Sequence, residues 1–331
     1  MLQRNNRALM RAGMALCALS TVTACQAYQR PDEPIALPRG TQGQRVAVRQ
    51  NRRMYVENRA ALTERGRTAT LFVHGFASNR DTWAMIEPAL RQDRATIAVD
   101  LPGFGLSDRT EGDYSPYALA DDLVTLLDHL GVPRCDVVAH SWGSSVALAL
   151  AMRHPTRIRR LVVIGAWVYE EQIPPFFRWA REPGVGEGLF ELFYRERLED
   201  RAPMGFAEGT EVPQATVDAI ERSLERPGTL RAALAAVRGQ YYAHMESQYR
   251  TIAARSLVMY GEDDRVALPR YGARLARELQ DGRMVTVGAS GHFPMFEAPG
   301  TVRRLVRDFL DAPEDQAPPA SVAVAHEEGA Q

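Results

Sequence analysis

Short apolar runs alternate with longer stretches of helical length between residues 44 and 310, and this alternation constrains the fold more than any other feature of the sequence. Most of the runs are rich in Val, Ile and Leu and lack an inside-outside alternation of polar residues. This composition is typical of strands that are covered on both faces, as in a parallel sheet. The sequence therefore predicts an α/β fold, with a mostly parallel, eight-stranded sheet flanked by helices.

Eight apolar runs are expected to form the strands. They are residues 45–48, 54–57, 70–73, 96–99, 135–139, 161–164, 256–260 and 284–287. Five stretches are expected to form helices, at residues 80–90, 116–130, 144–153, 270–279 and 300–310.

The sheet pattern lapses from residue 167 to about residue 255. This segment is rich in arginine and glutamate, contains embedded aromatic residues, and predicts several helices that lie over the sheet. Residues 45–311 are therefore interpreted as one domain with a helical lid inserted at about 167–255. The last segment, residues 312–331, contains several prolines and predicts a disordered tail.

The first 24 residues have the plan of a secretory signal. Arg4, Arg7 and Arg11 precede an uncharged stretch at residues 12–24. That stretch is too short for a bilayer core, which a helix needs about 20 residues to cross. We therefore expect a removable signal peptide at residues 1–24 rather than a membrane-spanning anchor.

The end of this signal, Val-Thr-Ala-Cys at residues 22–25, resembles the lipobox of bacterial lipoproteins. The resemblance implies cleavage before Cys25 and acylation of its thiol by a palmitate-type lipid that anchors the protein to a membrane. Gln26 implies, by the same resemblance, the outer membrane of the bacterial cell envelope, facing the periplasm. The alternative is ordinary cleavage after Ala24, which leaves Cys25 as a thiol. Residues 25–44 contain three prolines without periodicity and are expected to be a tether.

The composition excludes several kinds of chemistry. The chain has no lysine, so all 40 basic residues are arginine, whose guanidinium stays protonated and cannot act as a nucleophile or base. Schiff-base, pyridoxal-phosphate, Ser-Lys and P-loop chemistries are therefore excluded. A net charge of -1 with scattered arginines argues against a nucleic-acid partner. Three cysteines are too few and too unevenly spaced for a disulfide framework or a zinc site, and the sequence predicts no metal.

Residues 137–143, Val-Val-Ala-His-Ser-Trp-Gly, lead from an expected strand through a tight turn into an expected helix. Ala139 and Gly143 stand two positions before and after Ser141, and small residues there allow the turn to project a hydroxyl above the sheet. The string resembles the nucleophile elbow of the α/β-hydrolases, with alanine in place of the usual first glycine. The resemblance implies that Ser141 is a nucleophile.

Two further strings strengthen the resemblance. Residues 74–76, His-Gly-Phe, follow the expected strand 70–73 and resemble the histidine-glycine turn whose next backbone N–H faces the nucleophile. Residues 100–107, Asp-Leu-Pro-Gly-Phe-Gly-Leu-Ser, match a signature common in this superfamily. The resemblance covers about residues 44–310, although residues 167–255 match only in position.

The same resemblance implies the partners of Ser141, because this fold places an acid and then a histidine downstream of the serine. Asp264 lies in a Gly-x-x-Asp turn after one expected strand, and His292 follows the last expected strand. We interpret His292 as the base and Asp264 as the acid, with Asp263 as its nearest competitor.

The backbone N–H groups of Phe76 and Trp142 are expected, by resemblance, to form the oxyanion hole. Two other histidines have a structural interpretation. His74 is expected to hydrogen-bond within the turn that it begins, and His140 is expected to point away from Ser141 into the core or a pocket.

These residues predict a serine hydrolase that acts on a small-molecule carboxylic ester without a cofactor. Serine at position 141 disfavours the dehalogenases and epoxide hydrolases of this fold, which use aspartate there. One alternative is a prolyl-iminopeptidase-like enzyme, which shares the Ser-Trp-Gly-Ser string found at residues 141–144. It would need lid carboxylates to bind an ammonium group, and Glu170 and Glu171 are the candidates for them. A carbon-carbon bond hydrolase of the same fold and a non-catalytic envelope scaffold are two further hypotheses.

Overall fold

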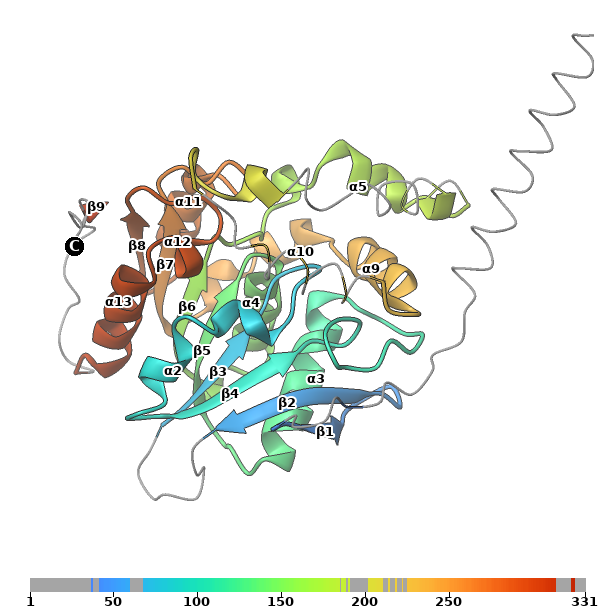
Figure 1. The fold of residues 1–331 in the computed structure, drawn as a ribbon, viewed down its shortest axis with the longest axis horizontal. Coiled ribbons are helices and arrows are strands. Elements are labelled where there is room, and N and C mark those ends of the chain that lie inside the picture. Colours follow the sequence, from blue (N-terminus) through green and yellow to red (C-terminus); the bar gives the residue numbers. More distant parts are fainter. Residues whose placement is uncertain are drawn as a thin grey trace, which may run out of the picture.

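A sheet of nine strands forms the centre of the computed structural model, and helices cover both of its faces (Figure 1). The structure describes residues 37, 42–59, 68–184, 186–188, 190, 202–210, 214, 218, 222, 225–313 and 323–324. The spatial order of the strands is β1-β2-β4-β3-β5-β6-β7-β8-β9. Strand β2 is antiparallel to both neighbours, and the other pairs are parallel. The bounds are β1 Gln44–Ala47, β2 Arg53–Arg59, β3 Ala69–Val73, β4 Ala95–Asp100, β5 Cys135–His140, β6 Ile158–Ile164, β7 Arg255–Gly261, β8 Gly282–Val287 and β9 Ala323–Val324.

The predicted α/β fold with a mostly parallel sheet is confirmed, and all eight expected strands are present with shifted or wider bounds. The ninth strand was not expected. It pairs in parallel with β8 and falls in the segment 312–331, where the sequence predicted no regular structure. Two residues are too short a run to produce a strand signal, which explains the difference. Residues 314–322 and 325–331 of that segment lie outside the described part of the chain.

The helices, including the short 3-10 turns labelled η, alternate with the strands along most of the chain. Their bounds are η1 Arg80–Trp83, α2 Glu87–Leu90, α3 Pro116–His129, α4 Trp142–Arg153, η2 Pro155–Arg157, η3 Glu170–Gln172, α5 Pro175–Ala180, η4 Ala202–Gly205, α9 Thr229–Arg238, α10 Tyr242–Glu246, η5 Tyr249–Thr251, α11 Pro269–Glu278, α12 Pro294–Glu297 and α13 Pro299–Asp311. The single helix expected at 80–90 is divided into η1 and α2. Pro88 explains the division, because proline has no N–H to donate within a continuous helix but is tolerated in the first turn, where it stands in α2.

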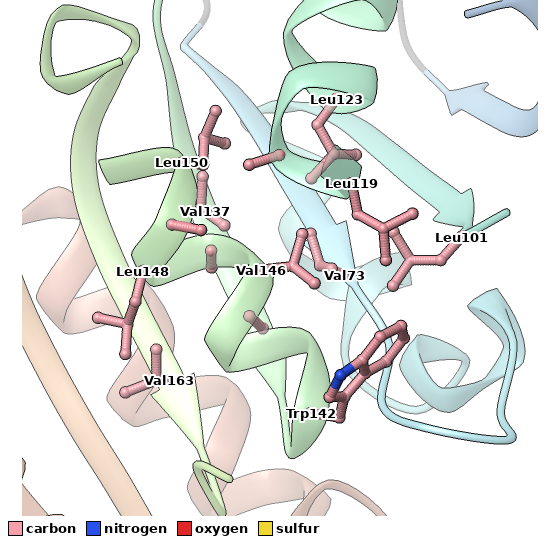
Figure 2. Close-up of a cluster of buried hydrophobic side chains, with 14 of the residues drawn as sticks. Val73, Leu101, Leu119, Leu123, Val137, Trp142, Val146, Leu148, Leu150 and Val163 are labelled. Atoms are coloured by element: carbon pink, nitrogen blue, oxygen red, sulfur yellow. The ribbon is translucent and has the colours of Figure 1, made fainter. Parts of the chain in front are cut away.

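Two apolar cores lie on opposite faces of the sheet, as the lack of alternation in the strands predicts. In β3, Leu71 and Val73 belong to the core that α3 and α4 cover, whereas Phe72 packs with residues of α2 and α13 on the other face. Figure 2 shows the first of these cores, where strand side chains meet the inner faces of α3 and α4. Its labelled members include Val73, Val137 and Val163 from the strands, Leu119 and Leu123 from α3, and Trp142, Val146, Leu148 and Leu150 from α4.

The segment between β6 and β7 contains η3, α5, η4, α9, α10 and η5 joined by turns and loops, and its described residues include no strand. In Figure 1, α5 lies beyond the ends to which the parallel strands point. This insertion corresponds to the helical segment expected at about 167–255. Within the described residues, no helix is both long enough and apolar enough to cross a bilayer. The predicted signal peptide, Cys25 and most of the tether lie outside those residues.

Candidate active site

Ser141 lies at the turn between β5 and α4 and adopts backbone angles that non-glycine residues rarely use, with φ 52° and ψ -125°. The turn is tight because α4 begins at the next residue. A Cβ added at Gly143 would lie only 2.2 Å from the carbonyl oxygen of His74, so only glycine allows this close approach. The glycine at position 143 therefore has a direct steric cause, and the turn is the strained strand-to-helix elbow that the sequence predicted.

His292 joins Ser141 to Asp264 in one continuous hydrogen-bond chain. Its Nε2 lies 2.9 Å from Ser141 Oγ, and its Nδ1 lies 2.9 Å from Asp264 Oδ2. The three side chains come from the ends of β5, β7 and β8, so the parallel sheet delivers them to the same edge. An ionised Asp264 can only accept, so Nδ1 carries the proton and Nε2 presents its lone pair to the Ser141 hydroxyl.

The environment of Asp264 keeps its carboxyl ionised. Oδ1 accepts hydrogen bonds from the backbone N–H groups of Val266 at 2.9 Å and Ala267 at 2.8 Å, while Oδ2 faces His292. Burial acts to raise the pKa of Asp264, but His292 and the two N–H groups outweigh it and hold the pKa below its usual value. Asp263 is exposed, and its backbone N–H donates to Ser290 O. The carboxylate placed against His292 is therefore that of Asp264.

Two backbone N–H groups beside Ser141 are available to an anionic ligand. Trp142 is the first residue of α4, where an N–H has no partner within its own helix and adds to the positive end of the helix dipole. Phe76 follows Gly75, and a Cβ added at Gly75 would lie 3.0 Å from Ser141 Cβ. Neither N–H donates to an acceptor among the described residues. An oxyanion hole requires preorganised donors near the nucleophile, and these two N–H groups are the candidates for that role.

The side chain of Phe76 packs among other aromatic rings. The Phe76 ring lies 5.6 Å from Phe104, 6.0 Å from Trp142 and 5.6 Å from Phe177, measured between ring centroids. The contacts with Phe104 and Trp142 are edge-to-face, a favourable arrangement for aromatic pairs. Phe177 belongs to α5, so the helical insertion contacts the same ring cluster as the elbow. The ring cluster (Phe76, Phe104, Trp142 and Phe177) carries no formal charge.

The comparison with known families agrees with this geometry. Residues 69–299 match the family model described as the alpha/beta hydrolase fold. The chain belongs to the alpha/beta hydrolase family. The 2-hydroxy-6-oxo-2,4-heptadienoate hydrolase of Pseudomonas putida is 29% identical over 267 residues, which cover 73% of this chain and 88% of that protein. The 2-hydroxymuconate semialdehyde hydrolase of a Pseudomonas species is 28% identical over 257 residues, which cover 72% and 86%.

Among solved structures, a thermophilic esterase from Thermogutta terrifontis has the same fold. Its TM-score is 0.67 at 23% sequence identity, with 82% of this chain and 98% of that chain covered.

In this alpha/beta hydrolase, His74 acts as a neutral link within its turn. Its Nδ1 donates to Gly75 O at 2.7 Å, because its Nε2 accepts a hydrogen bond from the Leu101 N–H at 2.9 Å. Burial lowers the pKa of His74, which keeps the ring neutral and preserves this pattern. The ring thus joins the turn after β3 to the turn after β4.

The side chain of His140 contacts His292, the proposed base, and hydrogen-bonds to its backbone rather than to the Ser141 hydroxyl. Its Nε2 lies 2.8 Å from the carbonyl oxygen of His292 and donates to it, and the two ring centroids are 4.8 Å apart. Burial, assisted by the neighbouring His292, lowers the pKa of His140 to about 3. His140 is therefore neutral, and it supports the backbone of His292 from the side of the elbow.

Replacing His140 with glutamine is expected to flatten the pH dependence of stability. An exposed histidine in the unfolded chain titrates near about pH 6.5, whereas His140 in the folded chain titrates at about 3. Between these values the unfolded state binds the extra proton, so stability is fully present above the unfolded pKa and falls as pH decreases. This residue should account for about 1.4 kcal/mol per pH unit. Urea unfolding at about pH 7 and about pH 5 measures the slope. An unchanged slope in His140→Gln would contradict the buried, neutral state.

The structure brings together all but one of the residues that the sequence singled out for the site. Those that meet at the elbow are Ser141, Asp264, His292, Phe76 and Trp142, whereas Cys25 lies outside the described residues. In the part of the chain that is described, no group of three or more His, Cys, Asp or Glu residues is placed to hold a metal ion. Sequence reasoning missed Glu297, whose carboxylate contacts the loop of His292. A lone glutamate in a short helix gave no signal that could have identified it.

Proposed function

We propose that this alpha/beta hydrolase cleaves a small, uncharged carboxylic ester through an acyl-enzyme, with Ser141 as nucleophile, His292 as base and Asp264 as the acid that orients it. The observation that carries the proposal is the unbroken hydrogen-bond chain from Ser141 Oγ through His292 to Asp264. A serine hydroxyl is a weak nucleophile at neutral pH and needs such a base, and the base needs a group that fixes its tautomer.

The reaction proceeds in two half-reactions. His292 Nε2 takes the hydroxyl proton as Ser141 Oγ attacks the ester carbonyl carbon, and the N–H groups of Phe76 and Trp142 donate to the resulting oxyanion. His292 then passes the proton to the departing alkoxide as the carbon-oxygen bond breaks. A water molecule next attacks the acyl-enzyme, with His292 again taking its proton, and the carboxylic acid is released as Ser141 recovers its hydrogen.

A carbon-carbon bond hydrolase is the second candidate, and it is favoured by the names of the two Pseudomonas relatives. A dienoate carries a carboxylate, which a site recognises with a cation or a set of donors. The ring cluster around the Phe76 and Trp142 donors is uncharged. Of these rings, only those of Phe76 and Phe177 are partly exposed, and their lack of charge supports an uncharged ester over a dienoate as the substrate.

The prolyl-iminopeptidase-like alternative needs carboxylates that are available to an ammonium group. Glu170 accepts hydrogen bonds from Arg181 Nη1 at 2.9 Å and from the Tyr242 N–H at 3.1 Å. Glu171 faces Arg274 at 3.4 Å. Both carboxylates already have cationic or N–H partners, which weighs against this alternative.

A substrate panel tests the proposal. Purified protein that begins after Cys25 would be assayed with p-nitrophenyl esters of increasing chain length, with 2-hydroxy-6-oxo-2,4-heptadienoate and with proline p-nitroanilide. We expect the highest kcat/KM for an ester. Turnover of the dienoate or the anilide without ester hydrolysis would reject the proposal in favour of the corresponding hydrolase. Absence of Ser141 labelling by a fluorophosphonate would favour the hypothesis of a non-catalytic envelope scaffold.

We further propose that the helical insertion acts as a lid over this site and that acylated Cys25 anchors the protein at the bacterial outer membrane. The contact of Phe177 with Phe76 supports the first idea, and the lipobox-like string at residues 22–25 supports the second. Incorporation of labelled palmitate that is abolished by Cys25→Ser would test the anchor.

A further inference from the structure

The side chain of His292 depends on a loop for its position. Residues 288–293 connect β8 to α12, and within them Ala289 has a φ of 48°, in the left-handed region that non-glycine residues rarely use. Loops are usually more mobile than the elements they connect. The imidazole must nevertheless remain at hydrogen-bond distance from two partners on other loops. Contacts that fix the backbone of this loop are therefore important for the proposed chemistry.

Glu297, at the end of α12, uses both of its carboxylate oxygens to hold this region together. Oε2 accepts a hydrogen bond from the Gly291 N–H at 2.9 Å, directly before His292 in the chain. Oε1 accepts one from the Ala207 N–H at 2.7 Å, in the helical insertion. One side chain thus bridges the loop of His292 and a segment 90 residues distant in sequence.

The insertion also contacts His292 directly. The His292 N–H donates to Gly205 O at 2.6 Å, and the rings of Phe206 and Phe293 stack with centroids 5.1 Å apart. The two backbones are so close that a Cβ added at Gly291 would lie 2.8 Å from both Gly205 O and the Ala207 nitrogen. The segment 205–207 is thus packed against the loop with no side chain between the two backbones.

We propose that Glu297 is a positioning residue whose carboxylate fastens segment 205–207 of the insertion to the His292 loop and so holds the imidazole between Ser141 and Asp264. The inference rests on the proposed function, because it concerns the same base. Hydrogen bonds from N–H groups to an ionised carboxylate are roughly twice as strong as those to a neutral acceptor. Burial raises the pKa of the Glu297 carboxyl and the N–H groups of Ala207 and Gly291 oppose that rise. In its ionised form the side chain makes a stronger link between the two segments than a neutral side chain of the same size could make.

Glutamine is an informative replacement because it keeps the size of the side chain and one acceptor oxygen. Its other terminal atom is a donor, which cannot accept from a backbone N–H. Glu297→Gln must therefore release either Gly291 or Ala207. A displacement of reacting groups by about 1 Å can cost about 100-fold in rate. We expect kcat per active site to fall about 10- to 100-fold with little change in KM, because the substrate contacts are retained.

The experiment compares Glu297→Gln with Glu297→Asp and with Glu208→Gln. Glu208 is exposed directly after this segment and pairs with exposed Arg265, at 3.3 Å, so its variant should match the wild type. Glu297→Asp keeps the charge but is too short to reach both N–H groups, so an intermediate kcat is expected. Active-site titration with a fluorophosphonate counts competent molecules, which separates slower turnover from loss of folded protein.

The outcomes are distinct. Unchanged kcat in Glu297→Gln, or a decrease explained entirely by fewer titratable sites, would overturn the positioning role. If Glu297→Gln does not fold, the same criteria apply to Glu297→Asp. The low-field proton resonance of His292 Nδ1–H, hydrogen-bonded to Asp264, gives a readout that needs no substrate. If the wild-type protein cleaves no ester, the proposed function is rejected. Loss of this resonance in Glu297→Gln would in that case still support the positioning role of Glu297.

Discussion

Ser141→Ala is expected to lower kcat/KM for p-nitrophenyl esters by at least about 10⁴-fold. The substitution removes the Oγ atom that lies 2.9 Å from His292 Nε2, and no acyl-enzyme can then form. The remaining activity would come from the oxyanion donors and from binding, which act on water as the nucleophile. Steady-state hydrolysis and fluorophosphonate labelling would both report the loss.

Ser144→Ala is the matched control for this experiment. Ser144 is buried in the first turn of α4, and its hydroxyl lies 3.5 Å from Ala139 O. The control removes a serine Oγ from the helix that begins after Ser141, without touching His292, so activity should be retained. Hydrolysis by Ser141→Ala at the wild-type rate would show that another nucleophile carries the reaction.

Asp264→Asn should lower kcat/KM by about 10⁴-fold while the fold is preserved. The carboxylate now accepts from His292 Nδ1 and from the N–H groups of Val266 and Ala267. If the new amide presents its NH2 group to His292, Nδ1 must become the acceptor and Nε2 the donor. The ring would then hold its proton against Ser141 Oγ and could not accept another. The effect should appear mainly in kcat, measured with the best ester.

Asp263→Asn provides the neighbouring control, because Asp263 is exposed and its backbone N–H, rather than its carboxylate, contacts the His292 loop through Ser290. Its activity should equal that of the wild type. A large decrease in Asp263→Asn together with retained activity in Asp264→Asn would transfer the role of the acid to Asp263.

The fold could be predicted largely from local pattern, because each buried strand is a separate apolar run. Strands β3, β4 and β5 are fully buried along their length, and each appears in the sequence as such a run. The division of the expected helix at 80–90 is also a local effect of Pro88. The pairing of β9 with β8 could not be predicted, because a two-residue strand forms only where a neighbouring strand already offers its edge.

Some residues of the candidate site could likewise be predicted from local pattern, and others could not. Ser141, Asp264 and His292 were found because each follows a strand end in a recognisable turn, and parallel strands bring such ends to one edge of the sheet. The neutral state of His140 and the bridge made by Glu297 were not predictable, because they depend on burial and on contacts between distant segments. Glu297 reaches Ala207 across 90 residues of chain, a distance at which sequence pattern carries no geometric information.

The sequence by itself thus determined the α/β layout, the elbow at Ser141 and the identity of the side chains at the strand ends, because these depend on local sterics and hydrophobic pattern. Only the tertiary structure decided which aspartate faces His292, which histidine is held neutral beneath it, and how the insertion is fastened to its loop. Those features arise from desolvation and hydrogen bonding between segments that meet only when the chain is packed.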